Sequence, residues 1–254
     1  MSKLQVKSVS GFSEFLSCLM KIAGGNSEGC KFVVGPESTE VNLITEDQGI
    51  RAFFKTDGIV AEDLVEFCFQ DLSKLKKSIN LIASIEALDE VDLDFNGTFI
   101  SYKGDVKFKL KTVKEDVVAQ FVSTKLKSSL ETIYTFNVTA ESIKQVIQCF
   151  NIVNNQDAKV YLSLSDDGKK IIAEVDNKLE QYTNSVGIPI SDEIEGTVSQ
   201  GVCVLLKHFE LFKVIPTSII KVSYTDKKVL KIESTSETAD CDISLVMISS
   251  IVKG

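Results

Sequence analysis

Arginine, histidine and tryptophan are nearly absent from this sequence of 254 residues. It has one arginine, Arg51, one histidine, His208, and no tryptophan, so lysine supplies almost all of the positive charge. Lysine is a hydrated point charge on a flexible stem, whereas the planar fork of arginine recognises anions in detail. A single histidine without a serine or cysteine partner motif gives no basis for catalysis. We therefore expect neither an enzyme nor a protein that reads an anionic partner in detail.

The sequence also lacks the usual signals for metal centres, disulfides and membrane spans. No apolar run reaches the roughly 20 residues that cross a bilayer, and no charged start followed by a long apolar core marks a signal peptide. The cysteines contain no CxxC pair and are expected to be reduced thiols that pack as small hydrophobic residues. They are Cys18, Cys30, Cys68, Cys149, Cys203 and Cys241. We expect a soluble protein of the reducing cytoplasm, without a metal or other cofactor.

Paired aspartates and Asp-Gly dipeptides could be taken for metal-binding or catalytic sites, but strand and turn structure explains them more simply. Asp92 and Asp94 could bind a metal ion, but VDLDF alternates like a strand and so places both carboxylates on the solvent side. Asp57-Gly58 and Asp167-Gly168 are typical of turns. These residues therefore predict no catalytic or metal-binding site.

A pattern of strand, helix and hairpin runs through the chain four times. Apolar residues recur at the 3.6-residue period of a helix in four segments, and alternating strands follow each of them. The segments are 10–24, 71–84, 140–155 and 207–216. We expect Asn96-Gly97 and Asp167-Gly168 to supply the positive φ angles of two-residue hairpin turns. The repeat predicts an α+β fold of two like domains, 1–116 and 134–254, joined by a connector, 117–133.

Apolar stripes predict which face of each helix is buried. In the first helix the stripe is Phe12, Phe15, Leu16, Leu19 and Ile22. In the second it is Leu72, Leu75, Ile79 and Ile82, and in the third it is Ile143, Val146, Ile147 and Phe150. The polar faces opposite these stripes are expected to be exposed.

The second helix, DLSKLKKSINLIAS, concentrates lysines in a chain whose formal net charge is −8. Lys74 and Lys77 lie on the side opposite the apolar stripe, and Lys76 lies on its flank. An ordinary solvated helix face would explain this cluster by itself. The other helices are neutral or slightly basic, however, so the acidic residues are concentrated on strands, turns and connector.

Two long segments resemble the DNA sliding clamp family. They are EFCFQDLSKLKKSINLIA with EVDLDFNGTFISYKGDVKFKLK, and GVCVLLKHFELFKVIPTSIIKVSYTDKKVLKIES with CDISLVM. The family includes the proliferating-cell-nuclear-antigen type of cells and the T4 type of bacteriophages, and these segments are more similar to the phage type. The resemblance covers the whole chain. It implies a viral replication protein acting in the cytoplasm of a bacterial host.

The resemblance implies a ring of three identical subunits around duplex DNA, with the helices lining the hole. Such a processivity factor has no active site, and its partners are the DNA polymerase and the clamp-loader ATPase. The residues expected to face DNA are Lys21, Lys74, Lys76, Lys77, Lys144, Lys207 and Lys213, with His208 as a further candidate. The alternative is a β-rich viral structural or protein-interaction module that does not bind DNA.

The resemblance also implies a pocket for partner peptides and an edge-to-edge subunit contact. The pocket residues expected are Phe121, Val122, Leu126, Leu130, Val246, Ile248 and Ile251, beside Val252. The subunit contact is expected between the last strand of the first domain and residues 173–181 of the next subunit. It would bring Lys107, Lys109 and Lys111 near Glu174, Asp176 and Glu180.

Overall fold

The structure is a computed structural model that describes most of the chain. The described residues are 2–23, 29–45, 47–119, 129–153, 158–176, 186–198, 200–215, 217–236 and 241–251. The chain forms two compact units. The first contains Met1–Lys125 and Thr235–Ile243, and the second contains Leu126–Ser234 and Ser244–Gly254. The domain limits expected from the sequence, 1–116 and 134–254 with a connector at 117–133, remain a prediction, because much of the connector lies outside the described residues.

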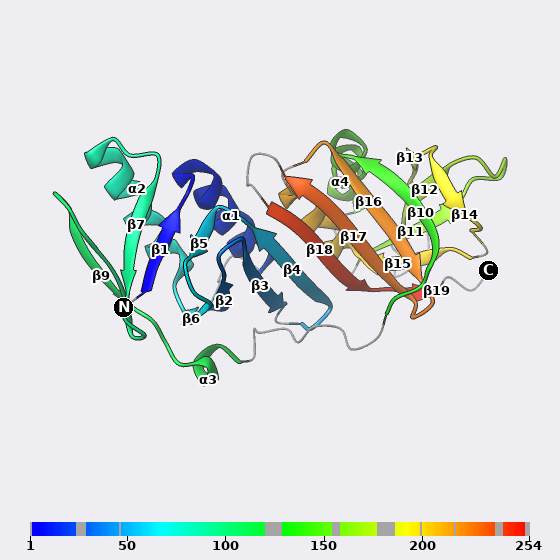
Figure 1. Ribbon diagram of the computed structural model, residues 1–254. Coiled ribbons are helices and arrows are strands. Elements are labelled where there is room, and N and C mark those ends of the chain that lie inside the picture. The colour runs from blue at the N-terminus through cyan, green and yellow to red at the C-terminus, as the bar shows by residue number, and fades with distance from the viewer. Residues whose placement is uncertain are drawn as a thin grey trace. The chain divides into compact units, whose positions relative to one another are not determined.

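In its described residues, the first unit combines antiparallel strands with two long helices and one short helix (Figure 1). Its strands are β1 (Ser2–Val6), β2 (Cys30–Val34), β3 (Thr39–Ile44), β4 (Ile50–Thr56), β5 (Ile59–Ala61), β6 (Val65–Phe69), β7 (Val91–Phe95), β8 (Phe99–Lys103) and β9 (Lys107–Lys111). Its helices are α1 (Val9–Ile22), α2 (Leu72–Glu86) and α3 (Glu115–Val118). One sheet has the order β5-β1-β7-β8-β9, and β4-β3-β2-β6 lie in order in another.

The second unit repeats this plan, but a short α-helix and a 3₁₀ helix stand where the first unit has α2. Its strands are β10 (Thr132–Thr139), β11 (Lys159–Leu164), β12 (Ile171–Asp176), β13 (Val186–Ser191), β14 (Ile194–Gly196), β15 (Val202–Leu205), β16 (Ile219–Thr225), β17 (Val229–Ser236), most of β18 (Cys241–Ile248), and β19 (Ser250–Ile251). Its helices are α4 (Ala140–Val153), α5 (Leu206–Phe209) and the 3₁₀ helix η2 (Glu210–Val214). The strand orders are β14-β10-β16-β17-β18 and β13-β12-β11-β15-β19. The predicted α+β fold with antiparallel sheets is confirmed.

The long helices form where the sequence supplies both a cap and an apolar stripe. Ser8 Oγ accepts a hydrogen bond from Gly11 N at 3.1 Å, and Asp71 Oδ1 accepts one from Lys74 N at 3.0 Å. Such N-caps satisfy backbone donors that the helix leaves unpaired. The stripes of α1 and α2 are buried at every predicted position. Each fully buried aliphatic or aromatic side chain contributes about 1.5–3 kcal/mol through the hydrophobic effect.

The helices of the second unit follow the prediction in part. Ile143, Val146 and Ile147 are buried on α4, and the side chain of Phe150 lies outside the described residues. The expected helix at 207–216 is instead one α-helical turn that continues as η2. Its poor apolar period does not support a longer α-helix, because the buried residues Phe209 and Phe212 are spaced for the tighter 3₁₀ turn.

The two-residue hairpin turns were predicted incorrectly. Gly97 has φ +85° and Gly168 has φ +70°, but neither Asn96 nor Asp167 has a positive φ. The side chain of Asn96 accepts hydrogen bonds from Thr98 N and Phe99 N, and that of Asp167 accepts one from Lys169 N. These side-chain bonds close longer loops, in which glycine alone needs the left-handed conformation.

Candidate nucleic-acid interface

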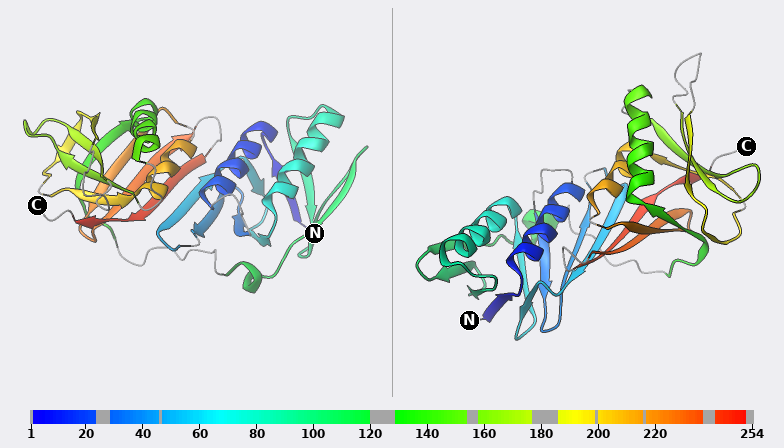
Figure 2. Two further views of the ribbon diagram at one scale, coloured as in Figure 1. Left: turned by 180° about the vertical axis from the view of Figure 1, so that it is seen from behind. Right: turned by 90° about the horizontal axis from the view of Figure 1, so that it is seen from above.

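The two long helices of the first unit lie side by side (Figure 2). Side chains of both helices line a polar groove. Lys76 on α2 donates a hydrogen bond from Nζ to Ser17 Oγ on α1 at 2.6 Å. The groove has a volume of about 790 Å³. Three cations and two carboxylates line it together with serine hydroxyl groups: Lys7, Lys21, Lys76, Glu14, Asp89, Ser10, Ser13 and Ser17. The structure thus brings together Lys21 and Lys76, which the sequence placed on separate helices.

The remaining lysines of α2 extend into solvent. The side chain of Lys74 is 72% exposed and forms an ion pair with Asp71 at 3.2 Å, one helical turn earlier. Partial burial opposes the ionisation of Asp71, but hydrogen bonds from Lys74 and its positive charge lower the pKa of the Asp71 carboxyl. Lys77 is also exposed. Because these cations are hydrated and accessible, they can approach an anion without costly desolvation.

The second unit presents fewer cations on its helices. Lys144 on α4, Lys207 on α5 and Lys213 on η2 are exposed. Lys213 lies 3.8 Å from the carboxylate of Glu210 on the same short helix. A DNA-facing role for His208 was predicted incorrectly, because its side chain is only 6% exposed and lies beside buried Phe209.

Sequence reasoning missed one cation and several hydroxyl groups of the groove. Lys7 precedes the N-cap Ser8 of α1 and lines the groove from the end of β1. Ser10, Ser13 and Ser17 line it from α1 itself. The spacing of these serines along one side of the apolar stripe was a signal that could have indicated a polar, hydrogen-bonding face.

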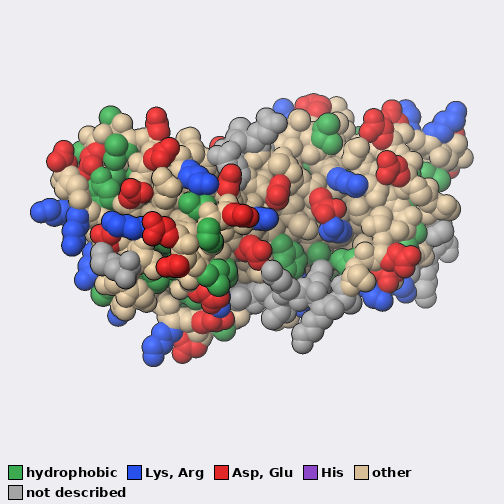
Figure 3. Space-filling model, viewed as in Figure 1, with side chains coloured by type: hydrophobic (Ala, Val, Ile, Leu, Met, Phe, Trp, Pro, Cys, Tyr) green, Lys and Arg blue, Asp and Glu red, His purple; other side chains and the backbone are tan. Residues whose placement is uncertain are grey.

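Acidic side chains are prominent on the strand side of the units. Figure 3 shows carboxylates interspersed with lysines over the strands. Several of these charges are paired there, for example Lys231 with Glu233 at 2.5 Å and Lys3 with Asp94 at 2.6 Å. Ion pairing with a nearby carboxylate thus occurs on the strands as it does at Lys74 of α2.

The strand β9 is an edge strand of the first unit, with β8 as its only neighbour among the described residues. Lys107, Lys109 and Lys111 are exposed and alternate with half-buried Phe108 and Leu110. Lys109 Nζ lies 3.8 Å from the centre of the Phe99 ring. On the side away from β8, the backbone groups of β9 have no strand partner among the described residues and can pair with another strand.

The expected partner edge in the second unit was placed on the wrong strand. Glu174 belongs to β12, which pairs with β11 on one side and β13 on the other. Among the described residues, the edges of this sheet are β13 on the side of β12 and β19 on the other. The side chain of Asp176 and all of Glu180 lie outside the described residues. The sequence reasoning went wrong because it took the strand after the first hairpin as the last one of the sheet.

The expected peptide pocket can be followed at only a few positions. Phe121, Val122, Leu126 and Val252 lie outside the described residues, and Ile251 belongs to β19 with a side chain that is not described. Leu130 is half-buried, Val246 is buried, and Ile248 is 60% exposed. Ile248 is thus a large apolar side chain at the surface near the end of β18.

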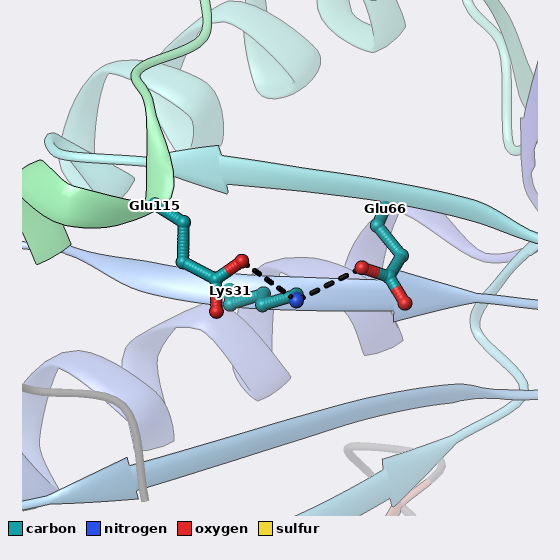
Figure 4. A network of polar contacts seen from close by, with 3 residues as sticks. All are labelled: Lys31, Glu66 and Glu115. Atoms are coloured by element: carbon teal, nitrogen blue, oxygen red, sulfur yellow. Dashed lines mark hydrogen bonds and ion pairs between the residues drawn. The ribbon is translucent and has the colours of Figure 1, made fainter. Parts of the chain in front are cut away.

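The short helix α3, which follows β9, is anchored to the sheet of the first unit. Lys31 on β2 bridges Glu66 on β6 at 2.8 Å and Glu115 on α3 at 3.0 Å, and these hydrogen bonds raise the pKa of Lys31 (Figure 4). Val118 is fully buried. It packs against Gly29, whose φ is +139° and where a Cβ would lie 2.3 Å from Val118 Cγ1. The start of the predicted connector is therefore fixed.

The described part of the chain has no group of three or more His, Cys, Asp or Glu side chains placed to hold a metal ion. Among the described helices, none combines the length and apolar character needed to cross a membrane.

Comparison with known proteins identifies the fold. No family model matches the sequence, and no curated protein matches it. The proliferating cell nuclear antigen (PCNA) of Entamoeba histolytica aligns with a TM-score of 0.70 at 12% identity over 98% of both chains. The PCNA of Thermococcus kodakaraensis gives 0.71 at 13% identity, over 98% of this chain and 100% of that one. The PCNA of A. fulgidus, solved with the C-terminal region of FEN-1, gives 0.73 at 10% identity over 100% of both. The chain has the PCNA-type clamp fold.

Proposed function

We propose that this protein is a DNA sliding clamp, a ring that encircles duplex DNA and tethers a replicative polymerase. The observation that carries the proposal is the agreement of its fold with PCNA across the whole length of both chains. The exposed lysines on α1 and α2 support it, because they give a chain of net charge −8 a local surface that attracts phosphate. Its sequence favours a bacteriophage protein of the T4 type, acting in the cytoplasm of a bacterial host.

The helix lysines would hold DNA loosely. Lysine contacts with phosphate groups are electrostatic and independent of base sequence. Lys74, Lys77, Lys144, Lys207 and Lys213 are exposed, and Lys21 and Lys76 line the groove between α1 and α2. A surface of flexible point charges permits movement along the duplex, because no contact fixes a register. The protein itself would perform no chemical step.

Three subunits would close the ring by pairing edge strands. The exposed edge β9 carries Lys107, Lys109 and Lys111, and β13 replaces β12 as the partner edge on the next subunit. Glu174, Asp176 and Glu180 remain candidates for side-chain contacts with these lysines. Apolar surface would add to the contact, since Leu81 and Ile85 on α2 are 52% and 57% exposed.

The polymerase and the clamp-loader ATPase are proposed to bind at an apolar surface near the connector. The candidate residues are Phe121, Val122, Leu126, Leu130, Val246, Ile248 and Ile251. Exposed Ile248 supports this assignment. A PCNA solved with the C-terminal region of FEN-1 is a relative in fold that binds a peptide segment of a partner.

The proposal is tested by the mass and shape of the particle in solution. Sedimentation equilibrium should give three times the subunit mass, and negative-stain images should show rings with a central hole. A monomer at concentrations well above 10 μM, or an open dimer, would refute the ring and favour an interaction module that does not bind DNA.

A further inference from the structure

The β8–β9 hairpin is attached to its sheet only near its base. β7 pairs with β8 at Asp94–Ser101 and Phe95–Ile100. The pairing of β8 with β9 continues farther, from Phe99–Lys111 out to Lys103–Lys107. The outer half of the hairpin therefore has no neighbouring strand on either side among the described residues. A two-stranded ribbon of this kind is at best marginally stable by itself.

One carboxylate ties this outer half to the helix layer. Glu86, the last residue of α2, accepts a hydrogen bond on Oε2 from the hydroxyl of Tyr102 on β8. Its Oε1 accepts a hydrogen bond from Val106 N at 3.1 Å. The Tyr102 ring stacks on Phe108 of β9, with 6.4 Å between ring centres. A single side chain thus contacts β8, the hairpin tip and, through Tyr102, β9.

The backbone around Glu86 is shaped for this contact. Ala87 adopts a left-handed conformation, φ 52° and ψ 46°, which ends α2 directly after Glu86. At Gly104 an added Cβ would lie 2.4 and 2.7 Å from the two carboxylate oxygens of Glu86. The hairpin tip therefore approaches the carboxylate closely because residue 104 has no side chain.

The charges at this contact favour an ionised glutamate. The hydrogen bonds from Tyr102 and from the backbone of Val106 lower the pKa of Glu86. The same contact raises the pKa of Tyr102 to about 12, with smaller contributions from burial and from Asp105 and Asp92. At neutral pH the tyrosine is the donor and the glutamate the acceptor, which makes the bonds charge-assisted.

We propose that Glu86 is a positioning residue for self-association, one that holds the edge strand β9 in the orientation in which a second copy of this chain pairs with it. The inference rests on the proposed ring, because it assumes that β9 is the strand that meets the next subunit. Its own basis is that Glu86 fixes the part of the hairpin that the sheet does not hold. Without this tie the strand edge twists freely, and pairing has to order it at an entropic cost.

The test compares self-association with stability in matched variants. Glu86→Ala removes both bonds, Glu86→Gln leaves one acceptor oxygen for two donors, and Tyr102→Phe removes the hydroxyl while keeping the ring. Asp105→Asn is the control, because it removes the same charge from an exposed residue of the hairpin tip. Sedimentation velocity over a concentration series gives the association constant, and thermal unfolding of the dilute protein gives the stability of the subunit.

Glu86→Ala should weaken association by about tenfold. Glu86→Gln and Tyr102→Phe should lie between it and the wild type, and Asp105→Asn should match the wild type. Amide exchange should quicken at Tyr102–Phe108 in Glu86→Ala, while the unfolding midpoint falls only slightly below that of the control, because the fold loses two hydrogen bonds at its edge. Wild-type association in Glu86→Ala overturns the positioning role alone. If Asp105→Asn weakens association as much as Glu86→Ala does, the effect is one of charge, and the positioning role of Glu86 is overturned as well. A monomeric wild type overturns the ring as well.

Discussion

The helices of the two units differ in a way that the duplicated fold does not require. In the first unit, α1 and α2 each run for three to four turns and share a groove that holds Lys7, Lys21 and Lys76. In the second unit, α4 is followed by a single turn and a 3₁₀ helix, and the histidine of that turn is buried. The same fold therefore gives one unit a polar, cationic helix surface and the other a sparse one. We expect DNA contact to depend mainly on the first unit.

The largest effect is expected from reversing charge on α2. The double variant Lys74→Glu and Lys77→Glu should lower DNA affinity by about a hundredfold at 0.15 M salt. Its fold should be unchanged, because exposed charges contribute little to stability. Fluorescence anisotropy with a labelled duplex measures the affinity. The control reverses Lys55 and Lys159, two exposed lysines on strands, and an equal loss in that control would remove the distinction between helix and strand lysines.

The anchored start of the connector is a feature of the first unit, and a change at Gly29 should damage it. Gly29→Ala places a methyl group against Val118 and Phe69 O at a positive φ. It should therefore cost about 2–3 kcal/mol in the free energy of unfolding. Gly97→Ala is the matched control, because Gly97 has φ +85° and no heavy atom within 4 Å of the added Cβ. That change should cost only about 1 kcal/mol. Urea unfolding measures both, and equal costs would contradict the packing of Val118 against Gly29.

A smaller effect should separate the helix lysines of the two units directly. Replacing Lys21 and Lys76 by alanine should lower DNA affinity by about tenfold and reduce the slope of log K against log salt by about two. Replacing Lys144 and Lys207 by alanine should change both quantities less. A salt titration of DNA binding by each double variant measures both quantities. A larger effect from replacing Lys144 and Lys207 would mean that DNA contact depends mainly on the second unit.

The smallest effect concerns one carboxylate in each unit that supports a hairpin. Tyr102 lowers the pKa of Glu86, and Ser165 lowers the pKa of Asp167, in both cases by donating a side-chain hydrogen bond. A carboxyl whose pKa is depressed by folding stabilises the fold above its unfolded pKa. That contribution is lost as the pH falls through the lower, folded pKa. Both hairpins should thus loosen below about pH 4. Amide exchange of the two hairpins, followed from pH 6 to pH 3, measures this loosening. Loosening already near pH 6 would be inconsistent with the lowered pKa values of Glu86 and Asp167.

Local sequence patterns predicted the helices well because burial imposes a period on them. Leu72, Leu75, Ile79 and Ile82 are all buried, as the stripe requires. The exposed lysines of α2 followed from the same periodicity. The short helix pair α5–η2 was harder, because a segment of about nine residues holds too few apolar positions to define a face.

The errors arose where pairing between distant segments decides the structure. Whether β12 or β13 forms the sheet edge depends on a partner beyond residues 177–185, and nothing within AEVDNKLEQ specifies it. The contact of Glu86 with Tyr102 and Val106 was missed because it joins a helix end to a hairpin tip. The groove between α1 and α2 was missed for the same reason, since Ser17 and Lys76 are far apart in the chain.

Topological retention on DNA tests the central claim most directly. The protein is allowed to thread onto a bead-bound linear duplex from its free end, which is then capped with a bulky bound protein, and the beads are washed at 1 M salt. A ring should stay on the capped duplex through the wash and leave when a restriction enzyme cuts between the two ends. Release by salt from capped and uncapped DNA alike would show that the protein binds only the surface of DNA, and would contradict a clamp that encircles it.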